Sequence, residues 1–137
     1  MFDSCVLGVD PGVANVGLAV VAHADRKVSL VWAWNRNKVS ALEVARATGA
    51  VMVVADRAGL PVEEYGPNEV KIAVTGAGNA DKDQVRDALV RIHGLRNCPV
   101  QADAVDAVAI ALTHLMGSRM RVAARTSGPT QVRSGTR

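Results

Sequence analysis

The 137-residue sequence lacks several features that would place it in an unusual class of protein. Aromatic residues make up only 3% of it, so the core has to be built from Val, Ala, Leu and Ile. No uninterrupted apolar run reaches the length of about 18 residues needed to span a bilayer, so no membrane span is predicted. The first ten residues contain an acid and no basic cluster, and therefore do not resemble a signal peptide.

Cysteine is also scarce. Cys5 and Cys98 are the two cysteines in the chain, and they do not form a CxxC pair. This usage predicts reduced thiols in a cytoplasmic protein, and it gives no sign of a disulfide framework or a zinc site. The length suits one domain with a single core.

The positive charge of the chain is concentrated at one end. Residues 118–137 contain five arginines and no acid, whereas the remaining chain has 11 basic and 13 acidic residues, a net charge of −2. We therefore predict a folded domain over residues 1–117, followed by a basic, disordered tail over 118–137. Such a tail either adds salt-dependent affinity for a phosphate backbone or only improves solubility.

The apolar pattern changes from short strands to helices along the chain. Three short apolar runs separated by turns predict an antiparallel meander, and the later segments have helical spacing with one further short strand among them. This order predicts an α/β fold with a mixed sheet and flanking helices. The predicted strands are 5–10, 16–22, 28–34 and 60–66, and the predicted helices are about 38–58, 67–76, 80–95 and 102–116.

Three aspartates are the candidates for chemistry. Asp10 ends the first strand, while Asp103 and Asp106 lie one helical turn apart at the start of the last helix. One interpretation is that the helix acids only complement the positive end of the helix dipole. The other is that all three meet in space and share a cation, for which hard oxygen ligands suit Mg²⁺ or Mn²⁺. Such a site can hydrolyse phosphodiesters.

Histidine contributes less to this picture. None of the three histidines is predicted to be a metal ligand. His114 follows Asp106 on a similar side of the last helix. One interpretation brings it to the edge of the active site; the favoured one places it at the surface near the end of that helix.

Three stretches together resemble the RuvC-type Holliday junction resolvases. They are "LGVDPGVANVGLAVV", "GLPVEEYGPNEVKIAVTGAGNADKDQV" and "QADAVDAVAIALTH". The resemblance covers roughly residues 5–116. It implies a ribonuclease H-like fold, a homodimer formed through the helix at about 38–58, and Mg²⁺-dependent nicking of four-way DNA junctions in recombination and repair. It also allows association with a branch-migration complex.

The resemblance assigns roles to five residues. Asp10, Asp103 and Asp106 match the acids that bind metal and carry out catalysis in that family. Lys71 and Lys82 match basic residues that lie near the DNA backbone.

The chain departs from the family pattern at one place. The family has a fourth acid, a glutamate at the end of a central fourth strand, and here the third strand continues directly into the next helix, with Leu30 at the matching position. A helix and a strand are therefore expected to be missing, the strand from the centre of the sheet. The acids that could substitute for the glutamate are Glu43, Glu63, Glu64 and Glu69.

Two alternative functions follow from this departure. A resolvase-like protein that has lost an acid could bind branched DNA without cutting it. A different ribonuclease H-like enzyme, such as a YqgF-type nuclease, has a similar length and a similar opening stretch, although its later motifs are not evident here.

Overall fold

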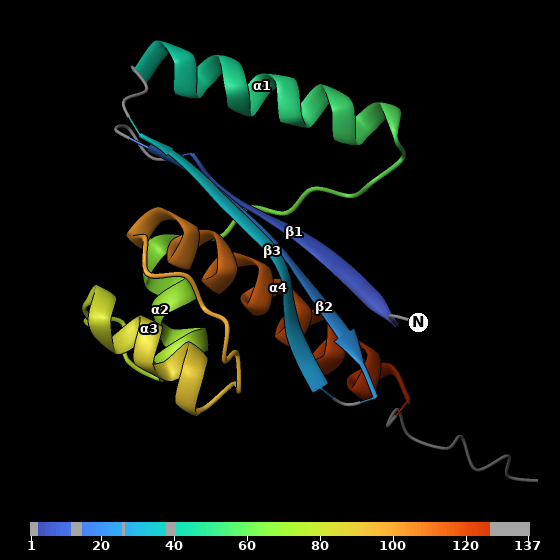
Figure 1. Ribbon diagram of the computed structural model, residues 1–137. Coiled ribbons are helices and arrows are strands. Elements are labelled where there is room, and N and C mark those ends of the chain that lie inside the picture. Colours follow the sequence, from blue (N-terminus) through green and yellow to red (C-terminus); the bar gives the residue numbers. More distant parts are fainter. Residues whose placement is uncertain (1–2, 12–14, 26, 38–40, 127–137) are drawn as a thin grey trace, which may run out of the picture.

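The computed structural model describes residues 3–11, 15–25, 27–37 and 41–126. Within these ranges three strands are followed by four helices (Figure 1). None of the described helices is both long enough and apolar enough to cross a membrane. The elements are β1 (Ser4–Pro11), β2 (Asn15–Ala24), β3 (Lys27–Asn37), α1 (Ala41–Arg57), α2 (Pro67–Thr75), α3 (Lys82–Arg91) and α4 (Ala102–Thr126).

The three strands form an antiparallel sheet in the order β1-β2-β3, as the predicted meander requires. Asp10 near the end of β1 lies opposite Gly17 of β2. Among the described residues, β1 pairs with no strand on its other side, so the strand that carries Asp10 is an edge strand. An edge strand leaves backbone N–H and C=O groups without partners in the sheet.

The predicted strand at 60–66 is wrong. These residues form an irregular linker between α1 and α2. Leu60 is 62% exposed and Val62 is 50% exposed, so their apolar side chains are not sandwiched against a neighbouring strand. The sequence predicted a short strand here, but a strand forms only where a partner is available to pair with its backbone.

The core lies between the sheet and α4. Helix α4 packs mainly across β1 and β2, and α2 and α3 pack on α4 (Figure 1). Helix α1 stands apart and meets the sheet mainly at β1. The buried apolar side chains are small or aliphatic, as the scarcity of aromatics predicts; those on α4 are Ala104, Val105, Ala107, Val108, Ala109, Ala111, Leu112 and Leu115.

Two strand glycines allow α4 to lie unusually close to the sheet. A Cβ atom on Gly17 would collide with the backbone carbonyl of Asp103, and one on Gly8 would collide with the carbonyl of Ala107. Neither glycine has a positive φ, so close approach is the reason for glycine at both positions. These contacts bring the first turn of α4 against the end of β1 that carries Asp10.

The C-terminal region differs in part from expectation. The residues from 118 onward are predicted to be disordered, yet α4 continues without a break to Thr126. The alanine and arginine residues of 119–126 are good helix formers, so they extend a helix that is already nucleated by its buried first turns. Residues 127–137 lie outside the described residues, and the division at 117/118 stays a prediction.

Candidate active site

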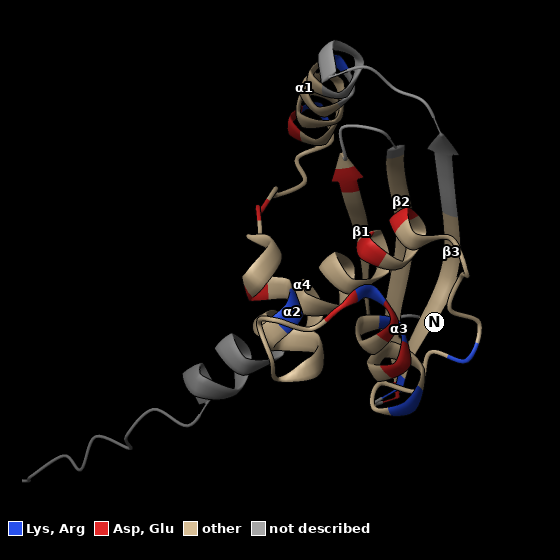
Figure 2. Cartoon of the chain, turned by 90° about the vertical axis from the view of Figure 1, so that its left-hand side faces the viewer, with Lys and Arg blue, Asp and Glu red and all other residues tan. Residues whose placement is uncertain are grey.

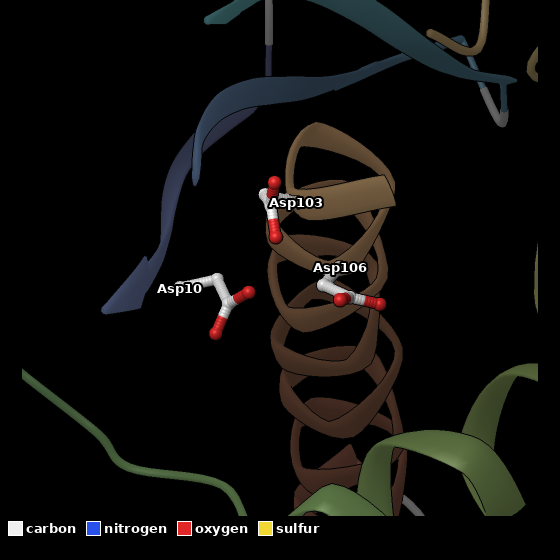
Figure 3. Close-up of side chains that lie close together, drawn as sticks. All are labelled: Asp10, Asp103 and Asp106. Atoms are coloured by element: carbon white, nitrogen blue, oxygen red, sulfur yellow. The ribbon is translucent and has the colours of Figure 1, made fainter. Parts of the chain in front are cut away.

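The structure brings the three predicted aspartates together. One carboxylate oxygen from each of Asp10, Asp103 and Asp106 lies within 4.8 Å of the other two, and all three residues are partly buried. Asp10 points from β1 toward α4, where Asp103 and Asp106 project from the first two turns (Figure 3). Three oxygen donors at this spacing match the ligand type that Mg²⁺ and Mn²⁺ prefer.

The pKa of Asp10 reflects both its burial and the neighbouring carboxylates. Burial is the main cause that raises its pKa from an ordinary value of 3.8 to about 6. The carboxylates of Asp106 and then Asp103 raise it further, because an ionised Asp10 is repelled by like charges. Lys82 opposes this shift. Without a cation, the cluster therefore holds a charge that the folded protein accommodates poorly.

This unfavourable negative charge predicts that removing the charge of Asp10 stabilises the metal-free protein. Because the pKa is raised on folding, metal-free protein should lose stability as the pH rises from about 4 through about 6, and the loss persists at neutral pH. Asp10→Asn should therefore increase the free energy of unfolding at pH 7.5 in EDTA by about 1–2 kcal/mol, after allowance for solvent screening. At pH 4.5 the difference should shrink. Urea unfolding at both pH values measures it.

The matched control is Asp56→Asn, which makes the same chemical change at an exposed position on α1. It should leave stability at both pH values within about 0.5 kcal/mol of the unchanged chain. An Asp10→Asn protein that is less stable than the unchanged chain at pH 7.5 would contradict the account of a repulsive acid cluster.

Two of the three aspartates, Asp10 and Asp106, line a cleft of about 930 Å³. Asp10 and Asp106 share its wall with Lys71 and Lys82, and the Lys82 ammonium lies 3.3 Å from the Asp106 carboxylate. Acidic residues gather at the end of β1 and the start of α4, with basic residues on α2 and at the start of α3 close by (Figure 2). The same cleft therefore presents metal-binding oxygens and two cations.

Three of the proposed substitutes for the missing acid, Glu63, Glu64 and Glu69, do not join the aspartates. Among the described residues, the only cluster of potential metal ligands is formed by the three aspartates. Glu63 and Glu64 line the cleft, and Glu69 instead caps α2 by accepting a hydrogen bond from the Gly66 N–H. The side chain of Glu43 lies outside the described residues.

The favoured expectation for His114, a surface position near a helix end, is wrong, whereas the alternative, a position at the edge of the active site, agrees with the structure. Because α4 extends to Thr126, His114 lies within the helix, where its side chain is 26% exposed and lines the cleft. Its Nδ1 atom lies 2.9 Å from the Tyr65 hydroxyl. The sequence gives no signal for this pair, since Tyr65 lies in the linker and the two residues are far apart in the chain.

Comparison with known proteins identifies the family. Residues 33–114 match the family model described as crossover junction endodeoxyribonuclease RuvC, and this match covers more than half of the chain. The chain belongs to the RuvC family. The resemblance found in the sequence is therefore confirmed, and neither the binding-only alternative nor the YqgF-type alternative is favoured. RuvC proteins are endonucleases that use a divalent metal, in agreement with the aspartate cluster described above.

Individual relatives extend the match to most of the chain. RuvC of Salinispora arenicola is 33% identical over 162 aligned positions, covering 87% of this chain and 93% of that protein. RuvC of Frankia casuarinae is 38% identical over 171 positions, covering 92% and 99%. The structure of Thermus thermophilus RuvC in complex with Holliday junction substrate superposes with a TM-score of 0.73 at 31% identity, covering 85% of this chain and 96% of that chain. The predicted ribonuclease H-like fold class is thereby confirmed.

The alignments also bear on the segment expected to be missing. The alignments with the Salinispora and Frankia proteins are both longer than the 137 residues of this chain, so each of these relatives contains residues without a counterpart here. The three-stranded sheet, with β1 at its edge, agrees with the loss of a strand next to β1.

Proposed function

We propose that this chain is a structure-selective endonuclease that nicks four-way DNA junctions by Mg²⁺-dependent phosphodiester hydrolysis, in recombination and repair. The observation that carries the proposal is the convergence of three aspartates within 4.8 Å, two of which line a cleft that also contains two lysines. The names of the relatives and the junction-bound Thermus structure support the choice of substrate.

The residues present fit a hard divalent cation. Asp10, Asp103 and Asp106 would hold Mg²⁺, with Mn²⁺ as a substitute, because all three donors are oxygens and Mg²⁺ usually keeps several waters. When bound, the cation supplies activation of a water and neutralisation of charge at the scissile phosphate. The three carboxylates would position it, and their partial burial limits how far they can move.

The two lysines are proposed to contact DNA. Lys82 is 67% exposed at its side chain and pairs with Asp106, so it can turn toward a phosphate without crossing a buried region. Lys71 lines the same cleft from α2. Both would fix the DNA backbone beside the aspartates and offset negative charge that develops on the phosphate.

A nicking assay tests this function. A labelled synthetic four-way junction and a linear duplex with the same arm sequences are incubated with the protein in Mg²⁺, Mn²⁺ or EDTA. We expect nicks in the junction with either metal, much slower cleavage of the duplex, and no cleavage in EDTA. Junction binding without nicking in either metal, at any protein concentration, would overturn the proposal and favour the binding-only alternative.

We also propose that the chain forms a homodimer through α1. Val53 and Val54 on this helix are 53% and 66% exposed, and a second copy would cover these apolar side chains. A symmetric dimer also fits a four-way substrate, because two identical sites can then act on two strands.

Val54→Asp is expected to convert the dimer into a monomer, because an unpaired carboxylate would be buried between two helices. Light scattering after gel filtration measures the mass. Val100→Asp, at a position 78% exposed before α4, is the control and should leave the mass unchanged. A chain that is already monomeric at assay concentration would rule out this dimer.

The cellular setting follows from the substrate. An enzyme of chromosomal DNA in recombination and repair would act in the cytoplasm, and association with a branch-migration complex is proposed on the family resemblance alone.

A further inference from the structure

Helix α1 is connected to the rest of the chain by a linker with little structure of its own. The helix ends at Arg57, two residues before Gly59, whose positive φ of 66° turns the chain, and the Leu60 N–H donates back to the Ala55 carbonyl. The linker then runs without regular structure to Gly66, where α2 begins. Helix α1 contacts the rest of the described structure mainly at β1. With so little other packing, the attachment of the linker strongly influences where α1 lies.

The linker is attached to α4 through Tyr65. Its ring packs against the core and meets the ring of His114 edge to face, with centroids 6.1 Å apart. Its hydroxyl lies 2.9 Å from His114 Nδ1 and donates to Glu63 Oε2 at 3.0 Å. His114, Tyr65 and Glu63 therefore form a hydrogen-bonded chain that runs from α4 into the linker.

The direction of these hydrogen bonds follows from proton counting. A phenol has one proton and an ionised carboxylate can only accept, so Tyr65 donates to Glu63. The Tyr65 oxygen must then accept from His114, which requires a proton on Nδ1. The Glu63 carboxylate also lies 3.9 Å from His114 Nδ1 and favours a donor at that atom.

We infer that His114 is a positioning residue: through Tyr65 and Glu63 it fixes the linker on α4, and thereby fixes helix α1 relative to the aspartates. This inference rests on the proposed function at one point, namely that α1 joins two copies of the chain. The hydrogen-bonded chain then sets the spacing between the two active sites of a dimer. Its loss should disturb paired cleavage of two strands more than the first nick.

The protonation of His114 provides a direct test on the full-length, metal-free protein. Nitrogen-15 NMR distinguishes a proton on Nδ1 from one on Nε2, and only three histidines contribute signals. The His114 signal is identified by its absence in His114→Asn. We expect the Nδ1–H form at neutral pH, replaced by a mixture in Tyr65→Phe, which keeps the ring and removes the hydroxyl. An Nε2–H form in the unchanged chain would overturn the inference.

The position of α1 is measured separately. Spin labels are placed on α1 at Asp56→Cys and at the exposed start of α4 at Ala102→Cys, in a Cys5→Ser background and diluted with unlabelled chain. The distance distribution should be narrow, and Tyr65→Phe should broaden it by about twofold or more as the linker is released. His114→Asn places an amide donor near the Nδ1 position, so the distance distribution should stay narrow in this variant. His114→Leu has no donor there and should give a broad distribution. Equal widths in all variants would overturn the inference.

Measuring the first nick and the nicking of both strands separately distinguishes a failure of this inference from a failure of the proposed function. Tyr65→Phe should nick the first strand of a four-way junction at a rate close to that of the unchanged chain, while the fraction of junctions nicked in both strands falls several-fold. Glu63→Gln should behave in the same way, and Glu64→Gln, its neighbour in the linker, is the control. An unchanged fraction in Tyr65→Phe would overturn the link to paired cleavage. An unchanged chain that cleaves nothing would refute the proposed function, whereas the NMR and distance results would still decide the role of His114.

Discussion

Replacement of Asp10 by asparagine is expected to slow junction nicking by more than about a hundredfold at saturating Mg²⁺, with junction binding nearly unchanged. The loss should exceed the roughly 10- to 100-fold that removal of an outer partner of a metal ligand costs, because Asp10 is itself proposed as a ligand. Single-turnover nicking and gel-shift titration in Ca²⁺ measure the two quantities. Because the same change should stabilise the metal-free fold, reduced activity cannot be attributed to unfolding.

Asp103→Asn and Asp106→Asn should reproduce this loss. The double variant Asp10→Asn/Asp106→Asn should be little worse than either single variant, because ligands of one metal act as a unit. Asp56→Asn again serves as the control and should retain full activity. Nicking by Asp10→Asn at a rate within about tenfold of the unchanged chain would mean that the aspartate cluster is not the active site.

Gly17→Ala is expected to have the second large effect. The added methyl group would collide with the backbone carbonyl of Asp103, and backbone cannot yield as a flexible side chain can. Helix α4 has to move away from β2, at a cost of about 2–3 kcal/mol or more in the free energy of unfolding. Because Gly17 lies opposite Asp10 in the sheet, this movement also separates Asp10 from Asp103. Urea unfolding and Mn²⁺ titration measure the two consequences.

Two other glycines make this prediction specific. Gly8→Ala should cost similar stability, because its methyl group would meet the carbonyl of Ala107 one turn further along α4. Gly49→Ala on α1 meets no atom within 4 Å and should stabilise the helix by about 0.5–1 kcal/mol. Gly17→Ala with unchanged stability and unchanged Mn²⁺ affinity would show that close packing of α4 does not assemble the site.

Much of the fold was predictable because its signals are local. The three strands are short apolar runs divided by turns, and Pro67 marks the start of α2 at the position where proline suits a helix. The linker at 60–66 was wrongly predicted as a strand, because a short segment of sequence does not indicate whether a neighbouring strand exists to pair with it. The extension of α4 to Thr126 was missed because composition favoured disorder over the continuation of a helix that tertiary packing had already formed.

The site was predictable in part. The spacing of Asp103 and Asp106 places them on one side of a helix, but nothing local indicates that Asp10 lies beside them; that proximity depends on α4 crossing β1 and β2. Gly8 and Gly17, which permit this crossing, carried a signal that could have been used, since glycine inside a strand often marks a close backbone approach.

A metal held by these three aspartates alone would be bound by fewer carboxylates than the four acids of the family pattern provide. Three aspartates provide the only clustered ligands among the described residues, and the strand that carries Asp10 lies at the sheet edge. With fewer carboxylates the site should depend more on cation concentration than a site with four would, because less negative charge attracts the second ion of a two-metal mechanism. Lys82, paired with Asp106, further reduces that charge.

The most direct test of the account is the location of a bound cation. Crystals of the full chain soaked in Mn²⁺ would be measured near the manganese absorption edge, where anomalous scattering identifies the ion without reference to the protein. We expect a peak whose protein ligands are carboxylate oxygens of Asp10, Asp103 and Asp106. A structure in which Mn²⁺ is held by other residues, or in which Asp10 lies apart from the two aspartates of α4, would contradict the central claim.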